Sequence, residues 1–516
     1  MDRNWGLHVP DDVTRKPIDI LICGGGTSGA ALAGIIARDT DAHVVLLEAG
    51  PDYGALSDSR WPEDLLDARR IPQSHGWGYE GSAHRNHQNA TPFERARVIG
   101  GCSSHNGCIA LLGHRRDYDA WAELGSVGWD WESVAPAFDR AVAALQAKSP
   151  ADDDITPFHQ AFIDGAVAAG IPRSSDMNDP DEAAGVGAPP VNVVDGVRWN
   201  TALAYLDPVR NRGNLTVIGD AIVDRVEISN GQAVAVHAIV GGRPERIEAK
   251  RIVLAAGAYG SPLILQRSGV GTEADLRRIG VDVIHKLPGV GHALADHPAV
   301  NLLYSPTPKL ERAMEAFGLE RWSPDEQTLA KACSSICREA FDIHIYSVAG
   351  WRTSDGEYAY GVAVSSVYPR STGQVTAVST DPTAAPRIEH NYLSDPENED
   401  LRVLLDGVEM ARQSMQPSID QGLLAAEIRP GSAVLSKADL TAHVEQHVGI
   451  YYHPACSCRM GPSSDADAVV DAAGKVHGID GLYVCDASIF PTLMRANTNL
   501  PAAMLAEHLA ESITNT

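Results

Sequence analysis

The sequence predicts an α/β fold in which the chain builds two interleaved domains, the first of them Rossmann-like. Three observations predict this fold. An apolar strand at 18–23 runs into a glycine turn and a helix, and a second apolar strand follows at 44–47. The last stretch, about 75 residues, returns to the glycine-rich, apolar character of the beginning. A length of 516 residues accommodates three small domains or two large ones, and a returning chain favours two.

The segments between these ends alternate in pattern. Helical patterns lie at 132–146, 400–416 and 502–513, and strand-like runs lie at 215–240 and 251–256. A polar, irregular region at about 300–440 carries short strand-like runs such as 360–364. Since neither a repeat nor a low-complexity linker divides the chain, this region is predicted to belong to the second domain.

The opening segment carries the dinucleotide-binding fingerprint Gly-x-Gly-x-x-Gly at Gly24, Gly26 and Gly29. The first glycine permits the turn, the second lets the backbone approach a pyrophosphate, and the third lets helix and strand pack closely. The pyrophosphate would bind at the helix N-terminus, where N–H groups and the helix dipole favour an anion. Glu48, nineteen residues after Gly29, is expected to bind a ribose hydroxyl.

Composition and charge exclude several classes. Hydrophobic residues make up 44% and charged residues 21%, which is typical of a globular protein and excludes a disordered or collagen-like chain. A net charge of −25 argues against binding to nucleic acid or to an anionic membrane surface. The 47 glycines, gathered in loops after apolar runs, indicate backbone held close to a bulky cofactor.

The cysteines and the apolar segments predict reduced thiols and no membrane span. Eight cysteines are too few for a disulfide framework, and neither Cys333 with Cys337 nor Cys456 with Cys458 has a second pair at metal-ligand spacing. No metal site is therefore predicted. Residues 18–37 contain a charged residue and five glycines, which argue against a signal or membrane segment. We expect a cytoplasmic protein.

Four later segments carry candidate chemistry. They are residues 97–112, which read RVIGGCSSHNGCIALL, residues 257–271, which read GAYGSPLILQRSGVG, the run from Tyr452 through His453 to Asp486 and Ala487, and residues 495–501, which read RANTNLP. The small polar cluster in the first segment lies between two apolar flanks, which indicates that something flat packs against it.

In this order, the segments resemble the glucose-methanol-choline (GMC) family of FAD-dependent alcohol oxidoreductases over nearly the whole chain. The resemblance is greatest to its choline oxidase branch. It implies a Rossmann-like FAD-binding domain interleaved with an α+β substrate domain built on an antiparallel sheet. The expected boundaries are 1–155, 215–300 and 441–516 for the first domain, and 156–214 and 301–440 for the second.

The resemblance implies FAD as the cofactor. The residues expected to bind it are Gly24, Gly26, Gly29, Glu48, Gly101, Ser103, His105, Asn106, Val223, Asp486 and Ala487. His105 lies where the choline-oxidising members attach FAD covalently, although a histidine there could also pack beside a non-covalent flavin. Asp486 could also be a plain helix cap.

Two departures from the family matter, one for the substrate and one for the loop after the catalytic histidine. Asp296-His297-Pro298 is followed by Ala299, where the choline oxidase branch has a glutamate that meets the quaternary ammonium. Burying an ammonium without a counter-charge is costly, which argues against choline as the substrate. Trp61 resembles an aromatic wall of the substrate cavity, although most tryptophans are core residues. Cys456 and Ser457 replace the usual Gly-Thr after the catalytic histidine.

The expected reaction removes a proton from oxygen and a hydride from carbon. His453 is the candidate for accepting the hydroxyl proton or stabilising the alkoxide, because an imidazole can act as a base and then as a charged donor. Asn497 would donate to the substrate oxygen without titrating, or would cap the last helix. His344 would orient the substrate, or would be a satisfied core histidine.

We therefore expect oxidation of a small polar primary alcohol to its aldehyde, with oxygen or another acceptor reoxidising the flavin. A sugar or aryl alcohol is the alternative substrate. A non-redox lyase of the same fold and a binding protein without turnover are the alternatives of another class. A homodimer is expected, and nucleic acid and membrane partners are not.

Overall fold

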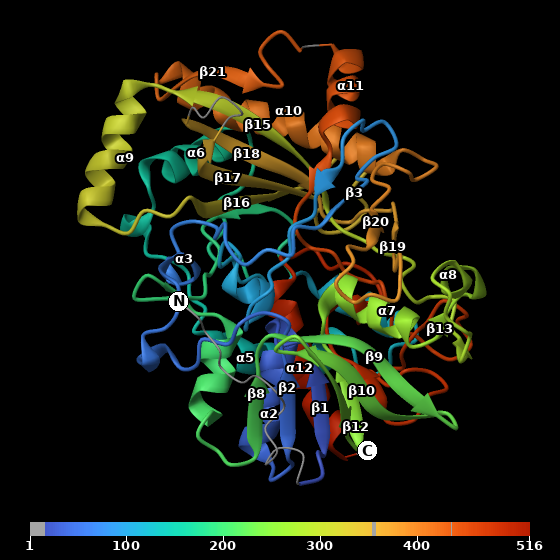
Figure 1. The fold of residues 1–516 in the computed structure, drawn as a ribbon. Coiled ribbons are helices and arrows are strands. Elements are labelled where there is room, and N and C mark those ends of the chain that lie inside the picture. The colour runs from blue at the N-terminus through green and yellow to red at the C-terminus, as the bar shows by residue number, and fades with distance from the viewer. Residues whose placement is uncertain (1–15, 353–357, 435, 516) are drawn as a thin grey trace.

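The computed structural model describes residues 16–352, 358–434 and 436–515, and the part of the first predicted domain at 1–15 lies outside the described residues. Its lower half is built on a five-stranded parallel sheet in the order β23-β12-β1-β2-β8 (Figure 1). The strands are β1 (Ile20–Cys23), β2 (Val44–Leu47), β8 (Leu215–Ile218), β12 (Arg251–Leu254) and β23 (Leu482–Val484). The predicted Rossmann-like opening is thus confirmed.

Helices and a small antiparallel sheet accompany the parallel sheet. The helices that pack against one another here are α2 (Thr27–Asp39), α5 (Trp131–Leu145) and α12 (Asn499–Asn515). The three-stranded sheet consists of β9 (Ala221–Ser229), β10 (Gln232–Val240) and β11 (Arg243–Glu248), and it contacts β2 and β12. β1 and β2 are buried at every position. A strand covered on both faces reads as a continuous apolar run, as these two do.

The upper half is built on a seven-stranded antiparallel sheet in the order β21-β15-β18-β17-β16-β5, with β22 pairing β15. Its strands are β5 (Gly185–Gly187), β15 (Pro298–Pro306), β16 (Glu326–Ala332), β17 (Ile343–Arg352), β18 (Tyr358–Ser366), β21 (Leu424–Arg429) and β22 (Gly449–Ile450). α6 (Pro157–Ala168) and α10 (Glu399–Asp420) pack on this sheet, and α9 (Pro308–Glu320) and α11 (Lys437–His447) lie near its periphery (Figure 1). The expected antiparallel sheet is confirmed.

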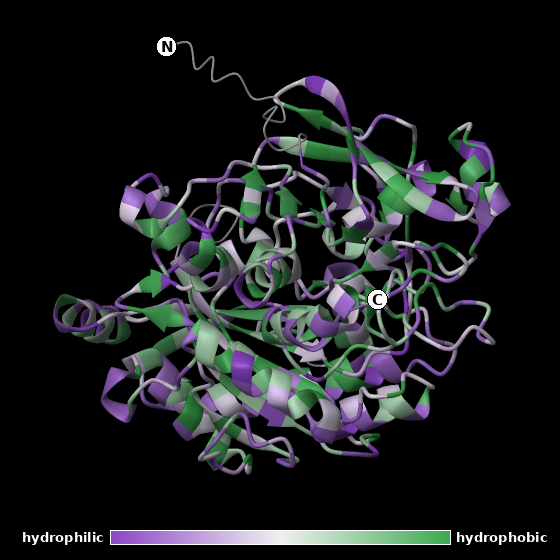
Figure 2. Ribbon diagram, turned by 90° about the horizontal axis from the view of Figure 1, so that it is seen from below, coloured by the Kyte–Doolittle hydropathy of each residue, from purple (hydrophilic) through white to green (hydrophobic). Residues whose placement is uncertain are grey.

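The chain passes between the two halves several times. It leaves the parallel sheet after β2, returns for β8 to β12, leaves again for β15 to β22, and returns for β23 and α12. The exact domain boundaries stay a prediction. Figure 2 shows hydrophobic strands inside the molecule and hydrophilic residues on outer loops and helix faces. Within the described ranges, no helix has the length and apolar character needed to cross a bilayer.

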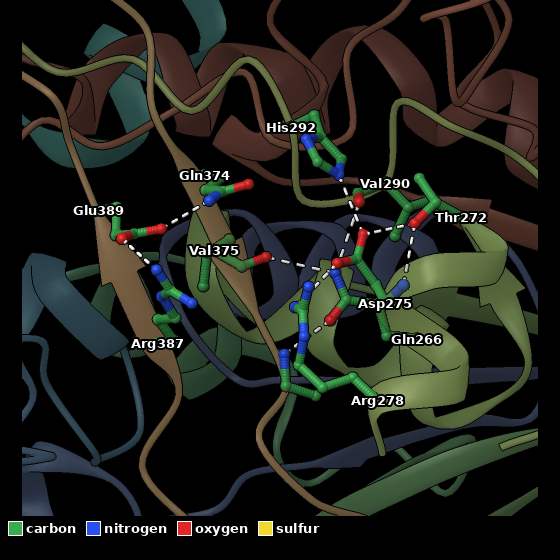
Figure 3. A network of polar contacts seen from close by, with 11 residues as sticks. Gln266, Thr272, Asp275, Arg278, Val290, His292, Gln374, Val375, Arg387 and Glu389 are labelled. Atoms are coloured by element: carbon green, nitrogen blue, oxygen red, sulfur yellow. Dashed lines mark hydrogen bonds and ion pairs between the residues drawn. The ribbon is translucent and has the colours of Figure 1, made fainter. Parts of the chain in front are cut away.

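A polar network ties the loop elements together (Figure 3). Gln266 of α7 (Gly257–Arg267) donates to the carbonyls of Val375 at 3.2 Å and Val290 at 3.4 Å, and its oxygen accepts the Ala377 N–H at 2.7 Å. Asp275 in turn contacts Thr272, Arg278 and His292. Gln266 therefore fastens the helix that follows β12 to the short strand β19 (Gln374–Thr376), which follows β18 in the chain.

Short elements complete the described fold. They are α3 (Glu63–Leu66), α4 (Arg115–Glu123), α8 (Glu273–Arg278), β3 (Glu80–Gly81), β4 (Thr91–Pro92), β6 (Val193–Val194), β7 (Val197–Arg198), β13 (Val270–Gly271), β14 (His285–Lys286), β19 (Gln374–Thr376) and β20 (Arg387–Glu389).

Candidate active site

A cavity of about 1350 Å³ is lined by residues of both halves. On the lower side it meets the carboxyl ends of the parallel strands, where β1 leads into Gly24, β2 into Glu48 and β12 into Ala255. On the upper side it meets Ala299 of β15 and Tyr346 of β17. The position agrees with the rule that open α/β sheets bind ligands at the carboxyl ends of their strands.

The glycines of the fingerprint form a turn that no larger residue fits. Gly24 has φ +112°, and a Cβ on it would lie 2.4 Å from the Ala255 carbonyl oxygen. A Cβ on Gly29 would lie 1.9 Å from the Gly24 oxygen, and one on Gly101 would lie 2.6 Å from the Gly26 Cα. Gly26 precedes α2 and offers no side-chain cap, so the first N–H groups of the helix are open to an anion. This cradle fits the pyrophosphate of a dinucleotide.

Two carboxylates accompany this cradle. Glu48 accepts the N–H groups of Gly25 and Gly50, each at 2.8 Å, and its burial raises its pKa to about 7. Asp486 accepts the Gly257 N–H at 2.8 Å and the Ser261 hydroxyl at 2.5 Å, and burial raises its pKa as well. Both carboxylates line the cavity, as Val223 and Ala487 also do.

The segment around His105 forms the wall beside this cradle. Gly101, His105 and Asn106 line the cavity, whereas Ser103 lies behind it and donates to the Gly100 carbonyl at 2.6 Å. The structure therefore gives Ser103 a role in holding the turn. His105 Nε2 lies 2.7 Å from the Ser74 carbonyl oxygen, so Nε2 carries the proton and Nδ1 is free for another contact.

His453 lies in the cavity wall as one member of a histidine pair. Its Nδ1 lies 3.0 Å from Nδ1 of His297, and the two rings meet edge to face. Burial holds the pKa of His453 well below its ordinary value, and His297 and Arg95 lower it further. Burial also lowers the pKa of His297 to about 3. Both imidazoles are therefore neutral near pH 7, with one proton shared between the two Nδ1 atoms.

A buried carboxyl group holds this pair in place. Asp296 Oδ1 accepts the backbone N–H groups of His297 at 2.8 Å and His453 at 2.9 Å, and Oδ2 accepts the Tyr392 hydroxyl at 2.9 Å. Its burial raises its pKa to about 7. Asp296 and His297 thus support His453, a role that the Asp-His-Pro triplet does not reveal in the sequence.

Asn497 lies in the same cavity as His453. Among the described residues its side-chain amide has no hydrogen-bond partner, and α12 begins two residues later at Asn499. The alternative role of Asn497 as a helix cap is therefore not observed. Its amide is available to a ligand.

His344 and Trp61 lie outside the cavity lining. His344 is fully buried, stacks on Phe341, and approaches Tyr451, whose ring centroid lies 4.9 Å from that of His453. Trp61 is in the core, where its indole N–H donates to the Gly54 carbonyl at 3.0 Å. The structure thus does not bring these two residues to the cavity, and their roles toward the substrate stay predictions.

The loop after His453 keeps an unusual backbone. Cys456 has φ +69°, in the left-handed region that favours glycine. The Ser457 hydroxyl donates to the Ala258 carbonyl at 2.5 Å, and the Cys456 N–H donates to the Ala487 carbonyl at 3.1 Å. Cys456, at a position where the family usually has glycine, therefore adopts a backbone conformation that is typical of glycine.

The sequence analysis missed several residues of the cavity wall. They are Arg95, Asp325, Glu326, Tyr346 and Tyr451. The first four belong to none of the segments singled out above, and Tyr451 directly precedes the run that starts at Tyr452. In the described ranges no group of three potential ligands could hold a metal ion.

Comparisons with known proteins agree with this geometry. Residues 18–299 and 369–506 match the GMC oxidoreductase family. The chain is 32% identical to "Oxygen-dependent choline dehydrogenase" of Photobacterium profundum, over 96% of this chain and 92% of that protein. It is 34% identical to the protein of the same name from Pseudomonas savastanoi pv. phaseolicola, over 97% and 94%.

Solved structures share the fold. Pyridoxine 4-oxidase from "Mesorbium loti" superposes with a TM-score of 0.85 at 27% identity, over 96% of this chain and 99% of that one. Formate oxidase superposes with a TM-score of 0.81 at 22% identity, over 96% and 98%. The glycine cradle, the His453 cavity and these matches agree: the chain belongs to the GMC oxidoreductase family and is an FAD-dependent oxidoreductase that acts on CH–OH donors.

Proposed function

We propose that this enzyme oxidises a small polar primary alcohol to its aldehyde, and that His453 and Asn497 manage the substrate hydroxyl. One observation carries the proposal: a neutral imidazole and an amide without a partner line the same cavity as the glycine cradle. Bound in that cradle, FAD would supply the hydride acceptor. The similarity to oxygen-dependent choline dehydrogenases supports alcohol oxidation and favours oxygen as the electron acceptor.

The contacts of His297 support His453 as the base. The backbone of Met494 favours a proton on the His297 ring, and Nε2, which has no hydrogen-bond partner in the described chain, is the position left for that proton because Nδ1 meets His453. His297 Nδ1 is then the acceptor, and His453 Nδ1–H is the donor. This arrangement leaves a lone pair on His453 Nε2, which is what a proton acceptor needs.

Asn497 would complete the step. Its amide N–H can donate to the substrate oxygen as negative charge develops there. Unlike a lysine or a second histidine, an amide does not titrate, so its contribution does not depend on pH. The proton leaves the hydroxyl for His453 while Asn497 holds the oxygen.

The covalent state of the flavin, the assembly and the location belong to the same proposal. His105 lines the cavity with Nδ1 free, which supports attachment of FAD through this residue. A homodimer and a cytoplasmic location stay predictions.

The test is anaerobic mixing of the purified holoenzyme with choline, ethanolamine, benzyl alcohol and sugars, followed at about 450 nm, where oxidised flavins absorb. Bleaching by one alcohol is expected, and rapid recovery in air would identify an oxidase. His453→Ala should slow bleaching by about 10²–10⁴-fold. His447→Ala, a histidine exposed on α11, is the matched control and should bleach as the wild type does. Bleaching of His453→Ala at the wild-type rate would refute the assigned role, and bleaching by no alcohol would favour a lyase.

A further inference from the structure

A carboxylate stands on the upper wall of the cavity. Glu326 is the first residue of β16 and pairs with Val348 of β17, and it lines the cavity together with Tyr346. Tyr346 pairs with Ala363 of β18, which in turn pairs with Asn301 of β15. All five residues line the cavity, so one face of the antiparallel sheet forms this wall.

Two contacts place Glu326 relative to the rest of the site. A Cβ on Gly107 would lie 1.7 Å from Glu326 Oε2, so the carboxylate packs against the backbone two residues after His105. The Tyr346 ring meets Tyr451 with centroids 6.5 Å apart, and Tyr451 meets His453 at 4.9 Å. A pair of tyrosines thus separates Glu326 from the proposed base.

The Glu326 carboxylate is incompletely satisfied. Oε2 accepts the Tyr346 hydroxyl at 2.9 Å, whereas Oε1 has no hydrogen-bond partner in the described chain. No Lys, Arg or His of the described residues lies within ion-pair distance of it. Burial and the nearby Asp325 raise the pKa of Glu326 to about 7, while Tyr346 and Arg198 act in the opposite direction. Tyr451, Tyr452 and Cys108 are further titratable groups that interact with it.

Arg198 does not account for this carboxylate. Its guanidinium is fully buried and donates to the carbonyls of Leu65, Asp67 and Arg70 and to the Cys108 sulfur. Four of its five N–H groups are therefore engaged without Glu326, and neither a hydrogen bond nor an ion pair joins the two side chains in the described chain. Oε1 has no hydrogen-bond partner and is not fully buried, so it is open to the cavity and can accept a hydrogen bond from a ligand there.

We propose that Glu326 binds a protonated amine of the substrate, so that the enzyme acts on an amino alcohol whose ammonium carries N–H groups. Such a group supplies both the positive charge and the hydrogen bond that Oε1 lacks, and the faces of Tyr346 and Tyr451 add cation–π attraction. A quaternary ammonium has no N–H to give, and a sugar has no charge. The inference rests on the proposed alcohol oxidation only for the hydroxyl end of the ligand.

The test is calorimetric titration of the holoenzyme at pH 8 with three ligands that lack a hydroxyl group: propylammonium, tetramethylammonium and neutral propionamide. The wild type should bind propylammonium at least tenfold tighter than either of the others. Glu326→Gln should weaken propylammonium at least tenfold and leave propionamide unchanged. Glu94→Gln removes another cavity carboxylate and is the matched control. Equal binding of the three ligands, or equal weakening in both variants, would overturn the proposal.

A second variant covers the case in which Glu326→Gln does not fold. Tyr346→Phe removes the hydrogen bond that stabilises the carboxylate, so the pH midpoint of propylammonium binding should rise. An unchanged midpoint would overturn the proposal. Because the three ligands cannot be oxidised as alcohols, this outcome is independent of turnover. If the enzyme binds propylammonium through Glu326 but no alcohol bleaches its flavin absorbance, the proposed function is refuted and the role of Glu326 is not.

Discussion

Replacement of Asp296 should disable the proposed base from a distance. The Asp296 carboxyl group accepts the backbone N–H groups of His297 and His453 and the Tyr392 hydroxyl. Asp296→Ala leaves these three buried donors without an acceptor, at about 1–3 kcal/mol each, or about 3–9 kcal/mol before water or relaxation compensates. That is a large part of an ordinary domain stability of about 5–15 kcal/mol. The His453 loop should therefore shift.

Asp296→Asn is the matched variant. Its carbonyl oxygen can accept both backbone N–H groups, and its amide can donate to the Tyr392 oxygen, so the expected loss is only about 1 kcal/mol. Thermal melting and anaerobic flavin reduction should separate the two variants. Asp296→Ala should melt several degrees lower and reduce flavin about 100-fold more slowly, as displacement of a reacting group by about 1 Å would cause. If Asp296→Ala matches Asp296→Asn in both measurements, the carboxyl group does not position His453 and the reasoning is wrong.

Three further predictions concern the cofactor and the cavity. Gly29→Ala puts a Cβ 1.9 Å from the Gly24 oxygen and should abolish FAD binding, measured as flavin absorbance per protein. Gly213→Ala is the control and should keep its FAD, because a Cβ there meets nothing within 4 Å. Equal flavin content in the two variants would contradict the role of the glycine cradle. Acid precipitation should leave the wild-type pellet yellow and the His105→Ala pellet colourless, and full release of flavin from the wild type would exclude the covalent link. Propylammonium affinity should rise with pH through about 7, because the raised pKa of Glu326 means that only the higher pH provides the carboxylate; a flat profile between pH 6 and 8 would count against Glu326.

Local rules explain what the sequence could predict. The fingerprint at 24–29 requires a strand, a turn that only glycine permits and a helix, and one short stretch of sequence contains the signals for all three. The helices predicted at 132–146, 400–416 and 502–513 are present as α5, α10 and α12. His453 and Asn497 could be singled out because each sits in a motif. Cys456, which stands where the family usually has glycine, has a φ of +69°, and its N–H donates to the Ala487 carbonyl.

Contacts between distant segments explain what the sequence could not predict. His297 and His453 are 156 residues apart, and nothing in either segment says that their Nδ1 atoms meet. Trp61 shows the opposite case. Its sequence context resembles a segment that forms an aromatic wall of the substrate cavity, but contacts with Gly54 and Tyr53 hold its side chain in the core. A match of local sequence specifies a residue type at a position, whereas the direction of its side chain depends on the elements that pack around it.

Glu326 and Tyr346 were missed for a reason that lies in the sheet itself. In the strands of an antiparallel sheet with one solvent-exposed face, polar and apolar residues alternate, and this alternation shows which side chains point toward the solvent. Here α6 and α10 cover one face, and the other face closes the cavity. β18 is consequently buried from Gly361 to Ser366 without alternation, and β16 from Gln327 to Ala332. Because polar and apolar residues do not alternate along these strands, the sequence pattern does not show which side chains face the cavity. That information comes from the strand register, in which Glu326 pairs with Val348 and Leu329 pairs with Tyr346. The substrate-binding side of such an enzyme therefore has to be read from strand pairing, and the charge that selects the substrate can lie on any strand of the sheet.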